Sequence, residues 1–263
     1  AERLAMLGAS VASIRFSRAA YTGMRDATVS VVAIPNGYAV KADGESVLFI
    51  EFGAGITYGT GLADRATQSY PVQLQKLLGE HYEVENFGKP GATLLNQGHR
   101  PYTRQEEYRK ALDFAGDIVV IHLGINDTDP RDWPNYRDSF VTDYLNLMDT
   151  FRKANPDVRI IIARMTPIAD RHNRFLSGTR DWHGEMQTAI ETVAHYAGVQ
   201  LIDFREPLYP YPFLLPDAVH PTAEGAAIMA KTVYSAITGD YGGLKLSPLY
   251  MDNMVLQRDT PLL

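Results

Sequence analysis

The sequence predicts an α/β fold in three layers, with helices on both faces of a five-stranded parallel sheet. Short apolar runs alternate with longer segments of helical periodicity along most of the chain, and this alternation is typical of parallel sheets covered on both faces. Glycine-rich or polar motifs follow directly after several of the apolar runs. In such sheets ligands bind beyond the carboxyl ends of the strands. We therefore expect a flavodoxin-like α/β/α sandwich with its site at that edge.

The first unit shows how each element is assigned. The apolar run 46–52 ends at Gly53, which indicates a buried strand entering a tight turn. A loop is expected next, and then apolar residues at helical spacing begin near Ser69 and stop at Gly79. By the same reasoning the predicted strands are 47–52, 82–86, 117–122, 158–163 and 199–203. The predicted helices are 69–79, 104–114, 134–154, 179–197 and 222–237.

The two ends of the chain differ from this repeating pattern. Residues 27–34 have strand character and are followed by a turn at 35–38, so residues 1–45 are predicted to form a small β-rich appendage. Residues 46–238 form the predicted main domain. Residues 239–263 are interpreted as a linker and the start of a possible following domain, because they are too few to fold alone. We expect the chain to be a module of a longer protein.

Composition excludes several classes of function. The 263 residues are 45% hydrophobic and carry a net charge of -6, so charge does not favour nucleic acid as a partner. No apolar run approaches the roughly 20 residues that span a bilayer, and no membrane partner is expected. The chain has no cysteine, which excludes disulfides and thiolate metal sites.

The turn after the first strand, residues 53–59, has the setting of a hydrolase nucleophile but not the nucleophile itself. Gly55 stands at the position where that setting would place a serine. The hydroxyl of Thr57 does not replace it simply, because Thr57 lies two residues further along and the turn would have to move. The identity of residue 55 therefore decides whether this chain is a working enzyme.

Three other motifs lie at the same edge of the predicted sheet. Gly91, after the second strand, offers a backbone N–H with no side chain to block a ligand. Asn126, after the third strand, supplies a side-chain amide donor. Asp217 and His220 precede the last helix, and a carboxylate at this spacing can orient an imidazole. Each residue alone also has an ordinary structural role: turn residues for Gly91 and Asn126, and a helix cap for the Asp217 and His220 pair.

Together these motifs resemble the SGNH, or GDSL, hydrolase superfamily over about residues 47–237. Its turn would read Gly-Asp-Ser-Ile-Thr where this chain has Gly-Ala-Gly-Ile-Thr at 53–57. The resemblance implies that position 55 is that of the nucleophilic serine and that His220 is the general base, oriented by Asp217. It also implies an oxyanion hole made by the backbone N–H groups of Gly55 and Gly91 and the side chain of Asn126. This mechanism needs no cofactor or metal.

The resemblance further implies a substrate class, an acetylated carbohydrate or another small ester. Family members with aromatic loops near the site often remove acetyl groups from polysaccharides or sialic acids, and Tyr58, Trp133 and Trp182 are predicted to bind such a substrate. Residues 244–258 resemble the opening of a sialate O-acetylesterase-type domain. A secreted or periplasmic location is implied by the family. The function expected is a carbohydrate O-acetylesterase that is inactive or strongly impaired because Gly55 replaces the nucleophile.

Two alternatives remain open at this stage. The first is a non-catalytic carbohydrate-binding protein on the same scaffold. The second is a dinucleotide-binding domain, since the glycines of the 53–59 turn also fit a loose dinucleotide-loop pattern. Whether Gly55 and the neighbouring Ala54 are natural or engineered is likewise open. Among the remaining histidines, His122 is predicted to be a satisfied core residue, and no metal site is predicted.

Overall fold

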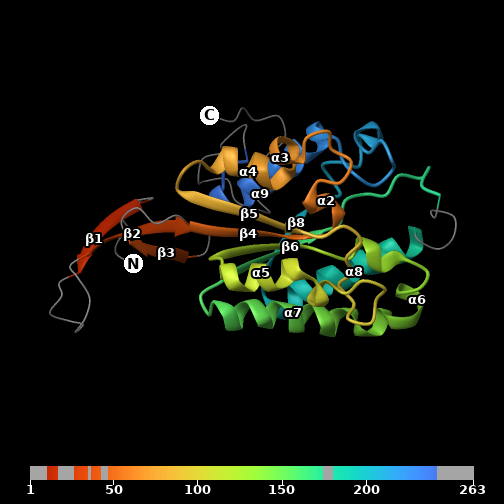
Figure 1. Ribbon diagram of the computed structural model, residues 1–263, viewed down its shortest axis with the longest axis horizontal. Helices are drawn as coiled ribbons and strands as arrows, with labels where there is room; N and C mark the ends of the chain where they lie inside the picture. The colour runs from red at the N-terminus through yellow and green to blue at the C-terminus, as the bar shows by residue number, and fades with distance from the viewer. Residues whose placement is uncertain (1–10, 17–26, 35–36, 43–46, 174–179, 242–263) are drawn as a thin grey trace, which may run out of the picture.

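The computed structural model describes residues 11–16, 27–34, 37–42, 47–173 and 180–241. Of residues 239–263, predicted to be a linker and the start of a following domain, only 239–241 lie within these ranges. Figure 1 shows a three-layer body, with a small separate sheet at its N-terminal end.

The five-stranded parallel sheet predicted from the sequence is confirmed. Its strands are β4 (Val47–Gly53), β5 (Tyr82–Gly88), β6 (Ile118–His122), β7 (Arg159–Arg164) and β8 (Gln200–Asp203). The strand order is β5-β4-β6-β7-β8, and every neighbouring pair is parallel. This is the flavodoxin-like order, in which the chain reverses direction across the sheet between β4 and β6.

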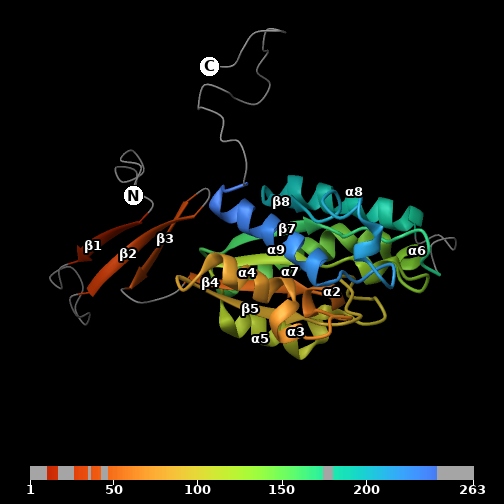
Figure 2. The ribbon, with the colours of Figure 1, turned by 90° about the horizontal axis from the view of Figure 1, so that it is seen from above.

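Helices cover both faces of the sheet (Figures 1 and 2). One face carries α4 and α9, and the other carries α5, α7 and α8. The longer helices are α4 (Tyr70–Leu78), α5 (Glu106–Phe114), α7 (Phe140–Ala154), α8 (Arg180–Ala197) and α9 (Ala223–Thr238). Every residue of β6 is buried between the two layers, which explains why its sequence is apolar throughout most of its length.

Two parts of the helix prediction are wrong. The single helix expected at 134–154 is broken into α6 (Trp133–Tyr136), the 3₁₀ turn η4 (Arg137–Ser139) and α7. The break begins at Tyr136, whose φ of -131° and ψ of 2° lie outside the helical region. The rings of Trp133 and Phe140, on either side of the break, pack with their centroids 5.2 Å apart. The loop expected after β4 also contains two single-turn helices, α2 (Gly55–Tyr58) and α3 (Arg65–Gln68).

A second sheet lies near the N-terminus. It contains β1 (Val11–Phe16), β2 (Ala27–Ile34) and β3 (Gly37–Ala42), paired antiparallel in that order. It stands apart from the five-stranded sheet in both views (Figure 2). The division of the chain into domains at residues 45 and 238 remains a prediction.

The register of the parallel sheet sets the location of the site. Gly53 at the end of β4 pairs with Gly88 on one side and with His122 on the other. Three strands therefore end side by side, and the segments that follow them converge at one edge. In the described part of the chain, no helix has the length and apolar character needed to cross a bilayer.

Candidate active site

The turn after β4 lies unusually close to the sheet. A β-carbon on Gly88 would overlap the backbone of Tyr58, and one on Gly53 would overlap the side chain of Thr57. Glycine at both paired positions lets α2 pack directly against the ends of β4 and β5. The side-chain amide of Asn86 also donates to the carbonyl of Thr57, at 2.8 Å. Together these contacts fix Gly55, the first residue of α2, at the sheet edge.

Gly55 faces the imidazole of His220. A β-carbon at position 55 would lie 3.1 Å from His220 Nε2, 3.1 Å from Thr60 Oγ1 and 3.7 Å from the Cα of Pro90. A side chain at this position would thus contact the ring nitrogen and one hydroxyl. These two neighbours would have to shift by a few tenths of an ångström to make room for it. The hydroxyl oxygen of Thr60 is buried and has no hydrogen-bond partner among the described residues.

Asp217 holds the His220 ring from behind. Its Oδ2 lies 2.6 Å from His220 Nδ1, and its Oδ1 accepts from the backbone N–H groups of His220 at 2.7 Å and Val219 at 3.0 Å. Partial burial raises the pKa of Asp217, but these hydrogen bonds outweigh that effect and lower it overall. The capping interpretation fails, because Thr222 caps α9 with its own hydroxyl. This pairing leaves His220 Nε2 directed at Gly55.

The loops after β5 and β6 also meet near Gly55. Gly91 has a φ of +76°, a left-handed conformation that glycine adopts without strain. The Asn126 amide donates one hydrogen to the carbonyl of Ala92, at 2.9 Å. An amide nitrogen carries two hydrogens, so this bond positions Asn126 while leaving it a second donor.

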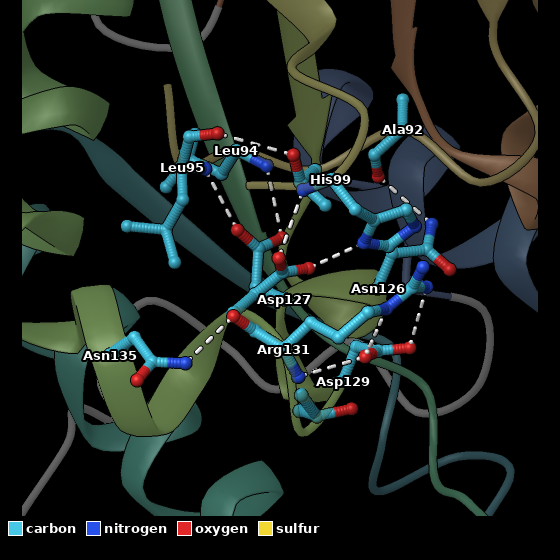
Figure 3. A network of polar contacts seen from close by, with 12 residues as sticks. Ala92, Leu94, Leu95, His99, Asn126, Asp127, Asp129, Arg131 and Asn135 are labelled. Atoms are coloured by element: carbon cyan, nitrogen blue, oxygen red, sulfur yellow. Dashed lines mark hydrogen bonds and ion pairs between the residues drawn. The ribbon is translucent and has the colours of Figure 1, made fainter. Parts of the chain in front are cut away.

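Asp127 ties these two loops together (Figure 3). It is fully buried, and its two carboxylate oxygens accept from the backbone N–H groups of Leu94 at 2.9 Å and Leu95 at 2.7 Å. Burial raises the pKa of Asp127 to about 7, although the two N–H donors act in the opposite direction. The segment containing Gly91 is therefore fixed relative to the one containing Asn126.

A cleft of about 280 Å³ joins these elements. Four of the predicted site residues line it, namely Gly55, Gly91, Asn126 and His220, while Asp217 lies behind His220. The cleft is also lined by residues that the sequence analysis did not select, including Thr60, His99, Asp129, Arg131 and His172. Nothing in the spacing of these residues marks them, because they come from loops whose paths depend on the tertiary fold.

The three aromatic residues predicted to bind substrate do not line this cleft. The ring of Tyr58 stacks with the guanidinium of Arg65, 3.9 Å from the ring centroid. Trp133 is 2% exposed, and its indole N–H donates to Glu185 at 2.8 Å. Trp182 is partly buried against the core. Contacts with other parts of the chain thus hold these rings outside the cleft lining, and a role in substrate binding remains a prediction.

His122 also differs from its prediction. It is fully buried, but neither ring nitrogen has a hydrogen-bond partner among the described residues. Its ring meets that of Phe204 edge to face, with centroids 5.0 Å apart. Burial lowers the pKa of His122 to about 3, so the ring is neutral at ordinary pH. Among the described residues no cluster of three side chains suited to a metal ion occurs.

Comparison with known proteins agrees with this geometry. The model of the GDSL-like Lipase/Acylhydrolase family matches residues 52–228, well over half of the chain. The chain belongs to this family. The matched range begins at the end of β4 and ends within α9, so it includes all the residues that line the cleft, and the dinucleotide-binding alternative is set aside.

Individual proteins are similar to this chain in sequence or in structure. An acetylxylan esterase of Xylanibacter ruminicola is 32% identical over 206 residues, which cover 70% of this chain but only 42% of that protein. Axe2, an acetylxylan esterase from Geobacillus stearothermophilus, has a similar structure with a TM-score of 0.55, at 19% identity, covering 73% of this chain and 94% of that one. The acetyl xylan esterase AlAXEase gives a TM-score of 0.56 at 21% identity, covering 72% of this chain and 99% of that one. The two structural matches support the fold.

Proposed function

We propose that residues 46–238 form an SGNH-type carbohydrate O-acetylesterase domain that lacks its serine nucleophile and is inactive or strongly impaired as it stands. One observation carries this proposal. A β-carbon at residue 55 would lie 3.1 Å from Nε2 of His220, whose ring is oriented by the carboxylate of Asp217. Gly91 and Asn126 line the same cleft. The arrangement supports every part of a serine esterase site except the attacking oxygen.

The roles follow from this geometry if residue 55 is serine. His220 would remove the hydroxyl proton as the oxygen attacks the ester carbonyl carbon, and the resulting oxyanion would be stabilised by the N–H groups of residues 55 and 91 and the Asn126 amide. His220 would return the proton to the departing sugar alcohol. A water molecule, activated by the same ring, would then release acetate from the acyl-enzyme. Without the serine, turnover is expected to fall about 10⁶-fold.

An acetylated polysaccharide is the substrate class we favour. The curated relative named above is an acetylxylan esterase, and a cleft of about 280 Å³ accommodates an acetyl group and part of a sugar rather than a long acyl chain. The chain spans less than half of that relative, so the substrate remains a proposal. A sialic acid bearing an O-acetyl group is the other substrate to be compared.

The test restores the missing oxygen. Acetate release is measured for the Gly55→Ser chain with acetylated xylan and with O-acetylated sialic acid, beside the unaltered chain and a Gly55→Ser, His220→Ala chain. Release from acetylated xylan that requires both the serine introduced at position 55 and the imidazole of His220 would support the proposal. If the restored chain releases no acetate from any carbohydrate ester, the proposed substrate class is wrong.

A second candidate is a carbohydrate-binding protein without catalysis. The observation that favours it is that the cleft residues remain in place although the nucleophile is absent: Asp217 still orients His220, and Asn126 still contacts Ala92. This function predicts that the unaltered chain binds acetylated xylo-oligosaccharides and that the Gly55→Ser chain gains no hydrolysis of them. Calorimetric titration followed by an acetate assay separates the two candidates.

A further inference from the structure

The cleft contains a second histidine held by a carboxylate, apart from the His220 and Asp217 pair. His99 Nδ1 lies 2.5 Å from Asp132 Oδ2, and the His99 backbone N–H donates to Asp132 Oδ1 at 2.9 Å. Both oxygens of this carboxylate thus contact the same residue. Asp132 is 1% exposed, so its carboxylate contacts His99 away from bulk water.

Asp132 does not have the ordinary role of an aspartate at its position. It immediately precedes α6, where an aspartate normally accepts hydrogen bonds from the first N–H groups of the helix. Its side chain makes no such capping bond and turns to His99 instead. A helix-stabilising role therefore does not account for this carboxylate, whereas the fixed orientation of the His99 ring does.

The other nitrogen of the His99 ring is available to a ligand. A carboxylate only accepts hydrogen bonds, so in the neutral form of the ring the proton lies on Nδ1 and Nε2 has a lone pair. No described residue donates a hydrogen bond to Nε2. The side chain is 25% exposed and lines the same cleft as Gly55 and Asn126. Figure 3 shows the His99 ring on the same side of the polar network as Asn126.

We propose that His99 Nε2 accepts a hydrogen bond from a sugar hydroxyl when the acetyl group of that sugar lies against the oxyanion donors. This inference rests on the proposed function. An acetyl group has a carbonyl oxygen and a methyl group, neither of which can donate a hydrogen bond. The donor that Nε2 requires is therefore on the carbohydrate, and His99 selects for a free hydroxyl close to the acetylated position.

Arg131, which lines the cleft together with His99, is suited to the same ligand. Arg131 is held by Asp129 through its Nε and Nη2 atoms, at 2.8 and 3.0 Å, while its side chain remains 64% exposed at the cleft. A guanidinium has five N–H donors in a fixed plane, so donors that Asp129 does not use remain on an exposed side chain. A hydrogen-bond acceptor at His99 and donors at Arg131 together match a sugar, whose hydroxyl groups both donate and accept.

The test is calorimetric titration of mono-acetylated xylotriose into the unaltered chain and three variants. His99→Phe removes Nε2 but keeps an aromatic ring, Asp132→Asn removes the charge that fixes the ring, and His81→Gln changes an exposed histidine on another loop. We expect Kd to rise about tenfold for His99→Phe, the order of one hydrogen bond. A smaller rise is expected for Asp132→Asn and none for His81→Gln.

A second measurement covers the case in which His99→Phe does not fold. The ¹⁵N resonance of His99 Nε2 in the unaltered chain should shift when acetylated xylotriose is added, and should stay in place when free acetate is added. Unchanged Kd for a folded His99→Phe chain, or an Nε2 resonance that the sugar does not move, overturns the inference and leaves the proposed function intact. If the unaltered chain does not bind the sugar, the inference also fails, and acetate release by the Gly55→Ser chain decides the proposed function separately.

Discussion

Introducing serine at position 55 is the most decisive test of the proposed function. Its β-carbon would lie 3.1 Å from both His220 Nε2 and Thr60 Oγ1, so the imidazole has to move by only a few tenths of an ångström. Loss of a triad serine lowers turnover about 10⁶-fold, and a misplacement of about 1 Å costs about 100-fold. The gain expected for Gly55→Ser is therefore between about 10⁴-fold and 10⁶-fold, equivalent to about 5 to 8 kcal/mol of transition-state stabilisation.

The assay is hydrolysis of p-nitrophenyl acetate, with mass spectrometry to detect an acyl group on residue 55. Gly55→Ala is the matched control, because it adds the same β-carbon without the oxygen. His220→Ala in the serine background should remove the gain. If the Gly55→Ser chain hydrolyses p-nitrophenyl acetate no faster than the Gly55→Ala chain while both are folded, the geometric argument for the nucleophile position is wrong.

Three further predictions concern the residues that support the cleft. Asp127→Asn should lower the free energy of unfolding by about 1 to 3 kcal/mol in urea titrations, because one of its two backbone N–H partners loses its acceptor; an unchanged midpoint would contradict this role. His122→Leu should become more stable relative to the unaltered chain as the pH falls. In the unfolded chain His122 binds a proton below about pH 6.5, whereas in the folded chain, where its pKa is about 3, it does not. The difference in unfolding free energy between the two chains therefore grows by about 1.4 kcal/mol per pH unit, to about 3 kcal/mol at pH 4.5. Parallel stability curves between pH 7 and 4.5 would refute this prediction. Gly88→Ala should displace α2 and lower the activity of the Gly55→Ser chain by at least about 100-fold. Gly184→Ala, at a glycine within α8 whose added β-carbon would meet nothing within 4 Å, should leave that activity unchanged.

The sheet could be predicted from sequence because its signals are local. Each buried strand is a short apolar run, and β6 is apolar along almost its full length because both of its faces are covered. The candidate site residues Gly55, Gly91, Asn126 and His220 follow strands or precede a helix in chain order, so the topology brings them to one edge. Their roles in catalysis remain a proposal.

The rest of the cleft depends on tertiary contacts that leave no periodic signal. His99 and Asp132 are separated by 33 residues, and only the folded loops bring them together. The packing of the aromatic residues is hidden in the sequence for a related reason, because position in a loop near the site does not reveal that Trp133 is buried against Phe140. The break of the helix after Tyr136 also lacks a local signal, because residues 136–139 include no proline or glycine.

The hydrogen bonds that link the loops after β5 and β6 do not include residue 55. Asp127 contacts Leu94 and Leu95, and Asn126 contacts Ala92. The spacing between the Gly91 and Asn126 donor groups therefore does not depend on the side chain at residue 55. Under the proposed function, a change at the single codon for residue 55 would therefore remove or introduce the nucleophile without altering these contacts. If the proposed function is correct, catalysis in this scaffold is separable from ligand recognition, and the chain would still bind its ligand without hydrolysing it.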